Sequence, residues 1–436
     1  MLNTKAVLWS SVKRIRGIDG DNLRGARATK GLCVPLGHVC IKEMRKFFCW
    51  FCLTGITTWG AAAQINESVF QSSTKVDTAR VAELGFELDN ISFFKDDEFA
   101  GGFQKGYTLP GFWVQPKFVY YPLKNVKLEL GAHLLRYWGA NKYPCYAYHD
   151  IEKWSGSQYQ KGFHALPWFR AQVDLSEHFS LVLGDIHGAA NHQLIEPLYN
   201  PEMNLMADPE AGVQILYRSS RFFLDVWANW QSFIFREDTH QEAFIVGLSS
   251  KTNLNDPSSN MAFYLPLQLM AQHRGGEIDT IYANSVQTLV NGAVGIGAVW
   301  NTGHALISKV GAEADAVFSY QQAGHLWPFD TGWGSHVKLY ADCRRLRAKV
   351  SYWRCDKFVS LAGSPFYNAI SLQDEGTVFH SPQMVCGGLE YTYPFADAFA
   401  VGADLDIYCH LKGRKSLATG ESVPKPYATS FSAGGF

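Results

Sequence analysis

Apolar and polar residues alternate with a period of two along most of the chain. Between residues 125 and 134 every even position is apolar, and Lys127 and Glu129 stand among the polar positions. The same alternation returns in 336–343 and 401–410. This period predicts β-strands that have one apolar face and one polar face.

We expect sixteen strands, separated by segments rich in Gly, Pro, Asn, Asp and Ser. The expected strands are 79–93, 111–121, 125–138, 162–174, 179–191, 209–218, 221–236, 242–250, 260–273, 286–300, 305–320, 332–344, 346–359, 382–393, 398–411 and 427–436.

The links between these strands alternate between long and tight. The first link, 94–110, is long, the next is a tight turn at 122–125, and 139–161 is long again. Two links depart from the pattern: 238–241 is short where a long link is due, and 251–259 is longer than a tight turn. An even number of strands with this alternation is typical of outer-membrane barrels, which have short periplasmic turns and longer external loops. A sandwich has no reason for such regular alternation. We therefore predict an all-β, transmembrane, antiparallel up-and-down β-barrel of about 16 strands.

The chain ends on an aromatic residue, Phe436, after the segment TSFSAGGF. In this feature and in its layout from Gln64 onward, the sequence resembles Gram-negative outer-membrane β-barrel proteins, and its general appearance resembles uncharacterised porin-like proteins of Bacteroidota-type bacteria. The resemblance implies an outer-membrane location. The last strand is short and rich in glycine, so the sequence alone does not decide how the barrel closes.

An export signal precedes the barrel. The segment 44–63 reads MRKFFCWFCLTGITTWGAAA and joins two basic residues, an apolar core of about ten residues and a small-residue cleavage site. We predict cleavage between Ala63 and Gln64, which makes 64–436 the barrel domain. We interpret 1–43 as an extension upstream of the true start at Met44; the alternative is a long basic n-region of the signal.

Composition after this cut excludes several classes of protein. The predicted mature chain has 29 Lys and Arg against 37 Asp and Glu, a formal net charge of −8, so we expect no nucleic-acid binding. Its five scattered cysteines form no disulfide framework and no zinc motif. No stretch after Gln64 approaches 18 consecutive apolar residues, so no transmembrane helix is expected.

Charged residues fall on the predicted inner face of the strands, in both signs. Because buried dry charges are costly, so many of them predict a water-filled lumen. The residues expected to line it are Glu83, Glu87, Lys127, Glu129, Asp225, Glu313, Asp315, Lys338, Asp342, Arg347, Lys349, Asp404 and Asp406. We expect a passive porin-like channel for small polar solutes, without a catalytic residue, cofactor or metal, and thus not an enzyme. Outer-membrane lipid and a homo-oligomeric partner are the other contacts we consider.

The segment 184–204, GDIHGAANHQLIEPLYNPEMN, is the most site-like stretch. We interpret 193–207 as a third external loop that folds into the lumen and narrows it. Glu196, Glu202 and the following Asp208 would add negative charge there. A metal site is also conceivable, but two histidines five residues apart lie on opposite faces of an extended chain. Its ligands would be Asp185, His187, His192, Glu196 and Glu202.

Two other functions remain open. An outer-membrane lipid hydrolase would need an activated Ser beside a His, but no G-x-S-x-G elbow occurs, and neither His325 nor His380 has an evident Ser partner at a defined spacing. A non-transporting surface barrel could bind carbohydrate by stacking sugar rings on loop aromatics. Those aromatics are Tyr143, Tyr146, Tyr148, Trp154, Tyr159, Trp327 and Phe329.

Overall fold

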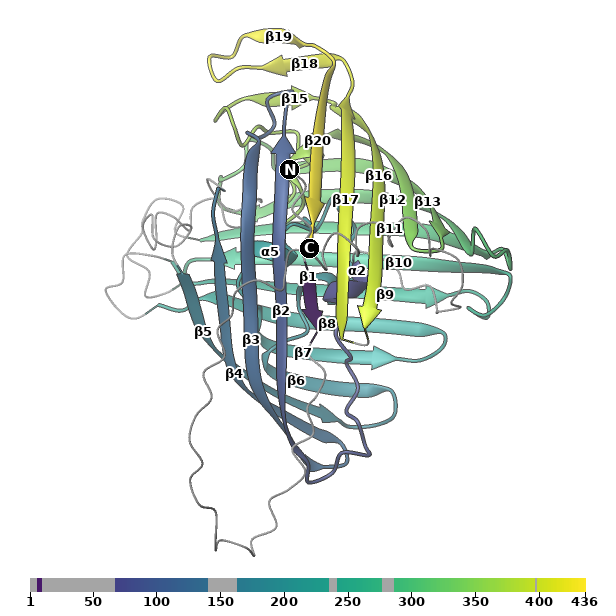
Figure 1. The fold of residues 1–436 in the computed structure, drawn as a ribbon. Helices are drawn as coiled ribbons and strands as arrows, with labels where there is room; N and C mark the ends of the chain where they lie inside the picture. The colour runs from purple at the N-terminus through teal and green to yellow at the C-terminus, as the bar shows by residue number, and fades with distance from the viewer. Residues whose placement is uncertain (1–5, 10–66, 140–162, 235–240, 277–285, 397) are drawn as a thin grey trace, which may run out of the picture. The chain divides into compact units, whose positions relative to one another are not determined.

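The computed structural model describes residues 6–9, 67–139, 163–234, 241–276, 286–396 and 398–436. In this part of the chain, sixteen antiparallel strands pair in chain order and close into a barrel (Figure 1). They are β2 (Leu84–Glu98), β3 (Tyr107–Leu123), β4 (Val126–Tyr137), β5 (Phe163–Asp174), β6 (Phe179–Asp185), β7 (Ala211–Arg218), β8 (Phe222–Ser232), β9 (Ala243–Asn253), β10 (Met261–Arg274), β11 (Gln287–Asn301), β12 (Lys309–Ala323), β13 (Thr331–Cys343), β14 (Leu346–Asp356), β16 (Gln383–Ala396), β17 (Phe399–His410) and β20 (Ala428–Gly435). The predicted fold class is confirmed, including the number of strands.

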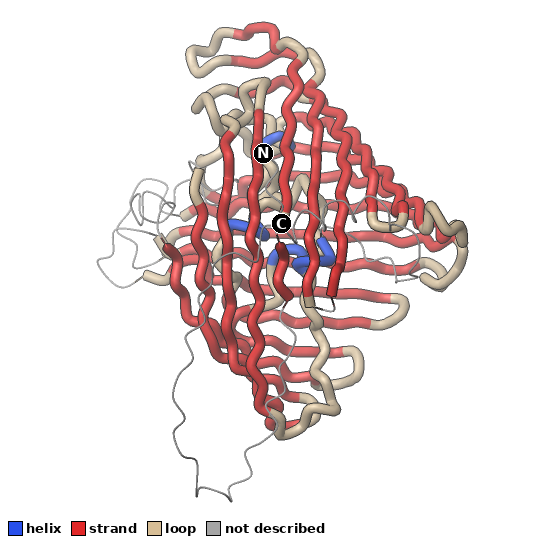
Figure 2. Tube along the Cα trace, in the orientation of Figure 1, coloured by secondary structure: helices blue, strands red, loops and turns tan. Residues whose placement is uncertain are grey.

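The last strand closes the barrel. β20 pairs with residues 403–410 of β17 on one side and with residues 94–98 of β2 on the other. A further short strand, β1 (Ala6–Trp9), pairs with the same two neighbours farther along. Strands make up the wall, and helices are few and short (Figure 2).

Most strand boundaries lie within two residues of the expected ones, and two of the larger departures have a local reason. The first strand was expected at 79–93, but β2 begins five residues later because the chain before it turns against β3, where the Ala82 amide donates to the Tyr121 carbonyl. β6 ends at Asp185 rather than 191. There the Arg170 guanidinium donates to the carbonyls of Asp185 and Ile186 and directs the chain inward.

A second, three-stranded sheet lies at the end of the barrel that carries the long links, at the top of Figure 1. It consists of β15 (Val378–His380), β18 (Gly413–Ser416) and β19 (Ser422–Lys425), paired antiparallel. The strands are three or four residues long and lie in links that we expected to be loops. Such short segments carry too few residues for a period-two pattern to be recognised.

The two faces of the wall differ in exposure as the alternation predicts. On β10, Leu267 and Leu269 point outward and are 49% and 41% exposed, whereas Gln268 and Met270 point inward and are 4% and 3% exposed. The outward residues form an apolar surface suited to lipid. Among the described residues, no helix is long and apolar enough to span a membrane.

Several sequence predictions fall outside the described residues. These are the leader at 44–63 with its Ala63–Gln64 cleavage site, the rest of the 1–43 extension apart from β1, and the five loop aromatics from Tyr143 to Tyr159.

A charge on the lipid face should destabilise the barrel according to its depth. We expect Leu267→Arg, near the middle of β10, to lower the free energy of unfolding by ~2–4 kcal/mol, because it places a cation near the bilayer midplane. Met261→Arg at the start of the same strand should cost ~0–1 kcal/mol. Denaturant unfolding in lipid vesicles measures the free energy of unfolding of both variants. Equal losses would contradict the placement of Leu267 near the bilayer midplane.

Candidate active site inside the barrel

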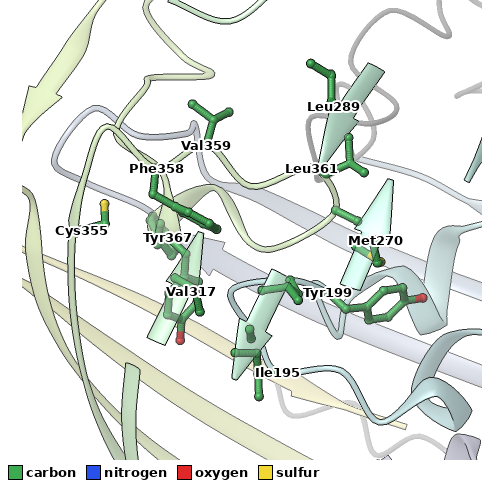
Figure 3. Packing of buried hydrophobic residues seen from close by; sticks show 14 of the residues in the cluster. Ile195, Tyr199, Met270, Leu289, Val317, Cys355, Phe358, Val359, Leu361 and Tyr367 are labelled. Carbon is green, nitrogen blue, oxygen red and sulfur yellow. The ribbon is translucent and has the colours of Figure 1, made fainter. Parts of the chain in front are cut away.

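Two links fold into the barrel and meet there. They are the inner loop 186–210, between β6 and β7, and the inner loop 357–382, between β14 and β16. The Ser360 hydroxyl donates to the Pro197 carbonyl at 2.6 Å, and the Asn200 amide donates to the Ala362 carbonyl at 2.8 Å. Apolar side chains from both loops pack with inward residues of the wall, as Figure 3 shows for Ile195, Phe358 and Met270, among others.

Amide side chains of the wall bind the backbone of these loops. Asn291 of β11 accepts from the Leu361 amide at 2.5 Å and donates to the Val359 carbonyl at 2.9 Å. Gln268 of β10 accepts from the Ile195 amide at 3.0 Å. A loop buried in a barrel must have its backbone groups satisfied, and here the wall supplies the partners.

The segment that leads into β2 also lies against the inner face. It begins with helix α2 (Glu67–Phe70). Gln172 of β5 donates to the Thr74 carbonyl at 2.8 Å, and the Val76 amide donates to Asp174 at 2.9 Å. These contacts fix the position of Ser72 along the barrel axis.

Ser72 forms a short contact with a buried histidine. Its Oγ lies 2.6 Å from Nδ1 of His187, and His187 Nε2 lies 3.1 Å from Oε1 of Gln172. Because the amide nitrogen of Gln172 already donates to Thr74, its oxygen faces the imidazole as an acceptor. His187 therefore carries its proton on Nε2, and Nδ1 is left to accept from the Ser72 hydroxyl.

The protonation state of His187 suits a general base. Burial lowers the pKa of His187 well below its usual value, and the nearby Arg170 cation acts in the same direction. Its backbone is held on both sides by Gln214 of β7, which accepts from the His187 amide and donates to its carbonyl. The imidazole is thus neutral at physiological pH and fixed in orientation.

Asn191 joins the serine segment to the inner loop. Its Oδ1 accepts from the Ser72 backbone amide at 2.8 Å, and its Nδ2 donates to the Gly188 carbonyl at 2.7 Å. Asn191 belongs to the short helix η2 (Ala189–His192), which begins two residues after His187. Serine and histidine are therefore positioned by one shared element.

A cavity of about 160 Å³ opens beside this pair. Trp113 and Trp168 give it two aromatic walls, and Lys117 and Arg170 add positive charge. Ser72, His187 and Asn191 line the same space. The arrangement provides a hydroxyl, a base, an orienting amide and room for a reacting group, which together can carry out acyl transfer.

The charges expected in the lumen lie in pairs along the inner wall. The structure pairs Arg80 with Glu83 and Glu87, Lys127 with Glu129, Lys338 with Glu313, Arg347 with Asp342, Lys349 with Asp406, His192 with Asp225 and His336 with Asp315. Asp404 lies at a smaller cavity that Lys95 also lines.

The three acids of the expected constriction have separate partners. Glu196 accepts from Tyr367 at 2.7 Å and pairs with Lys349. Glu202 accepts from Tyr107, and Asp208 faces His164 at 2.8 Å. Burial, with the neighbouring Asp97 carboxylate, raises the pKa of Glu202 to about 8. Glu202 is therefore largely neutral at pH 7 and adds little charge to the lumen.

The imagined metal ligands of this segment are also separated. His187 faces Ser72, whereas His192 faces Asp225 at 2.8 Å and Glu210 at 3.2 Å. Burial lowers the pKa of His192, but these two carboxylates outweigh it and raise the pKa to about 9. His192 is a buried cation in a structural triad, stacked on Trp227.

Sequence reasoning missed the serine of this site. Ser72 precedes the first strand, and 115 residues separate it from His187, so no local spacing relates them. His380, for which no serine partner was evident, lies 2.7 Å from Ser416 across the outer sheet. Burial of two segments inside the barrel brings Ser72 to His187, and strand pairing brings His380 to Ser416. A short sequence motif encodes neither.

The fold and the site together define a transmembrane β-barrel with an enclosed serine–histidine pair. The chain belongs to the lipid A 3'-O-deacylase-type family, whose model matches residues 76–434. The matched range begins after Ser72, so the assignment of that serine rests on geometry. No curated protein matches the chain.

Several solved barrels are similar to the chain at low identity. OprD, an outer membrane protein of Pseudomonas aeruginosa, is 11% identical, with 84% of this chain and 97% of that chain covered and a TM-score of 0.40. OccAB3 of Acinetobacter baumannii is 11% identical over 82% and 100%, with a TM-score of 0.42. A loop-deletion mutant of OmpT, an outer membrane protein of Vibrio cholerae, is 10% identical over 80% and 98%, with a TM-score of 0.41.

The expectation that the protein is not an enzyme is wrong, because the family is an enzyme family. That expectation relied on the absence of a nucleophile elbow, which is a signature of one hydrolase fold only. The narrower resemblance to porin-like proteins of Bacteroidota-type bacteria stays a prediction.

Removing a wall amide that binds the loop backbone should destabilise the inner loop 357–382. We expect Asn291→Leu to cost ~1–3 kcal/mol for each loop backbone group that it leaves unsatisfied. Ser319→Ala, which removes a single bond to the Val359 amide, should cost less. Hydrogen exchange of the backbone amides of residues 357–363 compares the stability of this loop in the two variants. Unchanged protection in the Asn291 variant would show that Asn291 does not hold the loop in place.

Proposed function

We propose that the protein is an outer-membrane hydrolase that removes an ester-linked acyl chain from a lipid of the lipid A type. The observation that carries the proposal is the Ser72–His187–Gln172 arrangement beside a cavity. The family description supports the reaction class and the substrate. The export signal predicted at 44–63 and the apolar outer face support the location.

The residues have distinct roles in this mechanism. Ser72 Oγ attacks the ester carbonyl, and His187 Nδ1 takes the hydroxyl proton and returns it to the departing alcohol. Gln172 keeps the imidazole in the required tautomer throughout. Water, activated by the same histidine, then hydrolyses the acyl-serine and releases the fatty acid.

Two other serine–histidine pairs in the described part of the chain fit this role less well. Ser430 lies 3.1 Å from His410, but its hydroxyl is also bonded to the Ala100 backbone at 2.9 and 3.2 Å, both shorter than the 3.3 Å second contact of the Ser72 hydroxyl, with Asn191 Oδ1. Ser416 and His380 form an exposed contact between two short strands, and within the described residues no other side chain hydrogen-bonds to the His380 ring. Ser72 is the candidate with both an oriented base and an adjoining cavity.

Removing the nucleophile should abolish hydrolysis. We expect Ser72→Ala and His187→Gln each to lower kcat by on the order of 10⁴-fold or more. Ser73→Ala is the matched control, because Ser73 is exposed and adjacent. Release of fatty acid from purified lipid A in detergent micelles gives the readout. Full activity in Ser72→Ala, or a loss in Ser416→Ala instead, would remove Ser72 from the mechanism.

A diffusion path through the lumen is the second candidate function. The inner charges of both signs favour it, since they suit a hydrated interior. The positions of the inner loops argue against an open diffusion path. Leu198 and Met206 of loop 186–210 are fully buried among the wall and the other loop.

Planar-bilayer recording tests the path. We expect the intact protein to conduct far less than an open sixteen-stranded pore, because its loops occupy the lumen. Deletion of 193–207 should raise the single-channel conductance if that loop is the barrier. Unchanged conductance after the deletion, in protein that still shows a heat-dependent gel shift, would rule the loop out as a constriction.

A further inference from the structure

We propose that the cavity beside Ser72 binds one sugar ring of the substrate, stacked on Trp113 and held through its hydroxyl groups by side chains of the barrel wall. The place of this ring in a reaction rests on the proposed hydrolase function. Its binding can be measured without hydrolysis.

The wall of the cavity is built from inward residues of neighbouring strands. Trp113, Gln115 and Lys117 stand at successive inward positions of β3, and all three line the cavity. Asp89 of β2 pairs with Gln115 in the strand register, and on the other side Nδ1 of His133 in β4 lies 2.8 Å from Nε2 of Gln115. Strand alternation therefore gathers an indole and several polar side chains on one patch of the inner face.

A second indole joins this patch because of a glycine. Gly131 of β4 stands between Lys117 of β3 and Trp168 of β5 in the strand register. A Cβ at Gly131 would lie 2.1 Å from the carbonyl oxygen of Pro116, so a larger residue does not fit there. Lys117 Nζ lies 5.3 Å from the centre of the Trp168 ring, so the two side chains meet across the glycine.

The Trp113 ring is fixed relative to the serine. Its Nε1 donates to the Asn204 carbonyl at 3.2 Å. The Asn204 side chain accepts from the Ala190 amide at 3.0 Å, and Ala190 belongs to η2, whose Asn191 binds the Ser72 amide. One residue of the inner loop thus connects the indole to the segment of the nucleophile. A ring stacked on Trp113 would therefore be held in a defined position relative to Ser72.

The polar side chains of the patch keep unused hydrogen-bonding atoms. Asp89 pairs with Lys117 through Oδ2 at 2.8 Å, and within the described residues its Oδ1 has no partner. Gln115 donates to His133 Nδ1, which leaves the proton of His133 on Nε2. In the same part of the chain, that Nε2 and the Gln115 side-chain oxygen have no partner either. Sugar hydroxyl groups both donate and accept, so they match a set that contains acceptors and a donor.

A sugar ring suits this lining better than a fatty acyl chain does. An acyl chain would cover Asp89 and Gln115 without bonding to them, which is unfavourable for buried polar groups. The size of the cavity, about 160 Å³, agrees with a single ring. A cavity of about 150 Å³ is enough for one six-membered ring such as benzene. The acyl group of an esterified sugar can contact Val69 and Phe70, which shortly precede Ser72 and line the same cavity.

A phosphate group suits the cavity less well, although two cations line it. Lys117 pairs with Asp89 at 2.8 Å and lies 3.8 Å from Glu129. Arg170 donates to two backbone carbonyls and lies 3.6 Å from Glu129. Both cations are already engaged, so an anion would have to displace these contacts. A neutral ring leaves them in place.

The binding experiment uses the Ser72→Ala protein in micelles of a detergent without a sugar headgroup. The probe is methyl β-D-glucopyranoside, a neutral single ring, observed by saturation-transfer difference NMR. We expect its ring protons to receive saturation. Adding Trp113→Leu should weaken binding by about ten-fold or more, because a flat indole face makes a larger contact with a ring than leucine does. Trp333→Leu is the matched control, because Trp333 is 54% exposed.

Gln115→Leu provides a second variant in case the protein does not fold without Trp113. It removes the unused acceptor at similar side-chain volume, and we expect several-fold weaker binding. The heat-dependent gel shift shows whether each variant is a closed barrel.

The active protein offers an independent measurement. Its substrates are 6-O-octanoylglucose and p-nitrophenyl octanoate, which share the acyl group and differ in the sugar. We expect Trp113→Leu to lower the ratio of kcat/KM for the sugar ester to that for the nitrophenyl ester by about ten-fold. Trp333→Leu should leave this ratio unchanged.

Three results would overturn the sugar site: no saturation of the probe, equal binding in the Trp113 and Trp333 variants, or displacement of the probe by octanoate or inorganic phosphate but not by glucose. The hydrolase proposal is judged separately. If the unmodified protein hydrolyses neither ester but Ser72→Ala protein binds the probe through Trp113, the sugar site stands and the hydrolase fails. Hydrolysis that needs Ser72, with a substrate ratio that Trp113→Leu does not change, supports the hydrolase and overturns the site.

Discussion

The hydrogen bonds of β20 to β17 and β2 are the constraint on which the rest of the structure depends. In hydrocarbon every backbone group must find a partner within the protein, so a sheet in a membrane is stable only when closed. Closure separates two environments. Leucines such as Leu267 face outward, and ion pairs such as Lys127 with Glu129 face inward. Without the last strand those inner charges would have access to lipid, at a cost of several kcal/mol each.

The interior follows from the size of the closed sheet. Sixteen strands enclose more space than their own side chains can fill, and here two links and the segment before β2 occupy it. Filling the space with backbone requires donors and acceptors on the wall. Gln268 and Asn291 supply them, and Gln172 serves both the segment of Ser72 and the ring of His187. The site is therefore assembled by the same amides that hold the filling in place.

The sequence predicted the wall well and the site poorly, for physical reasons. Alternation with a period of two is imposed by the two environments along every strand, so strand number and most boundaries could be read from it. The same alternation says which face a residue takes but not what lies opposite, so the partners of Glu196 and Asp208 could not be foreseen. Ser72 meets His187 only because the segment before β2 and the start of loop 186–210 both lie inside the barrel, which leaves no trace in local spacing. The short outer sheet was not predicted for a related reason. Its strands, which carry His380 and Ser416, come from separate links.

The bonds from Asn291 to loop 357–382 also bear on how the loop is retained in the barrel. Asn291 is fully buried, and its two bonds lie behind a wall that has no free edge once β20 is in place. Once β20 closes the wall, strand pairing seals its sides, and the loop can reach or leave these bonds only through an open end of the barrel. Closure by the C-terminal strand therefore confines the docked loop to the lumen.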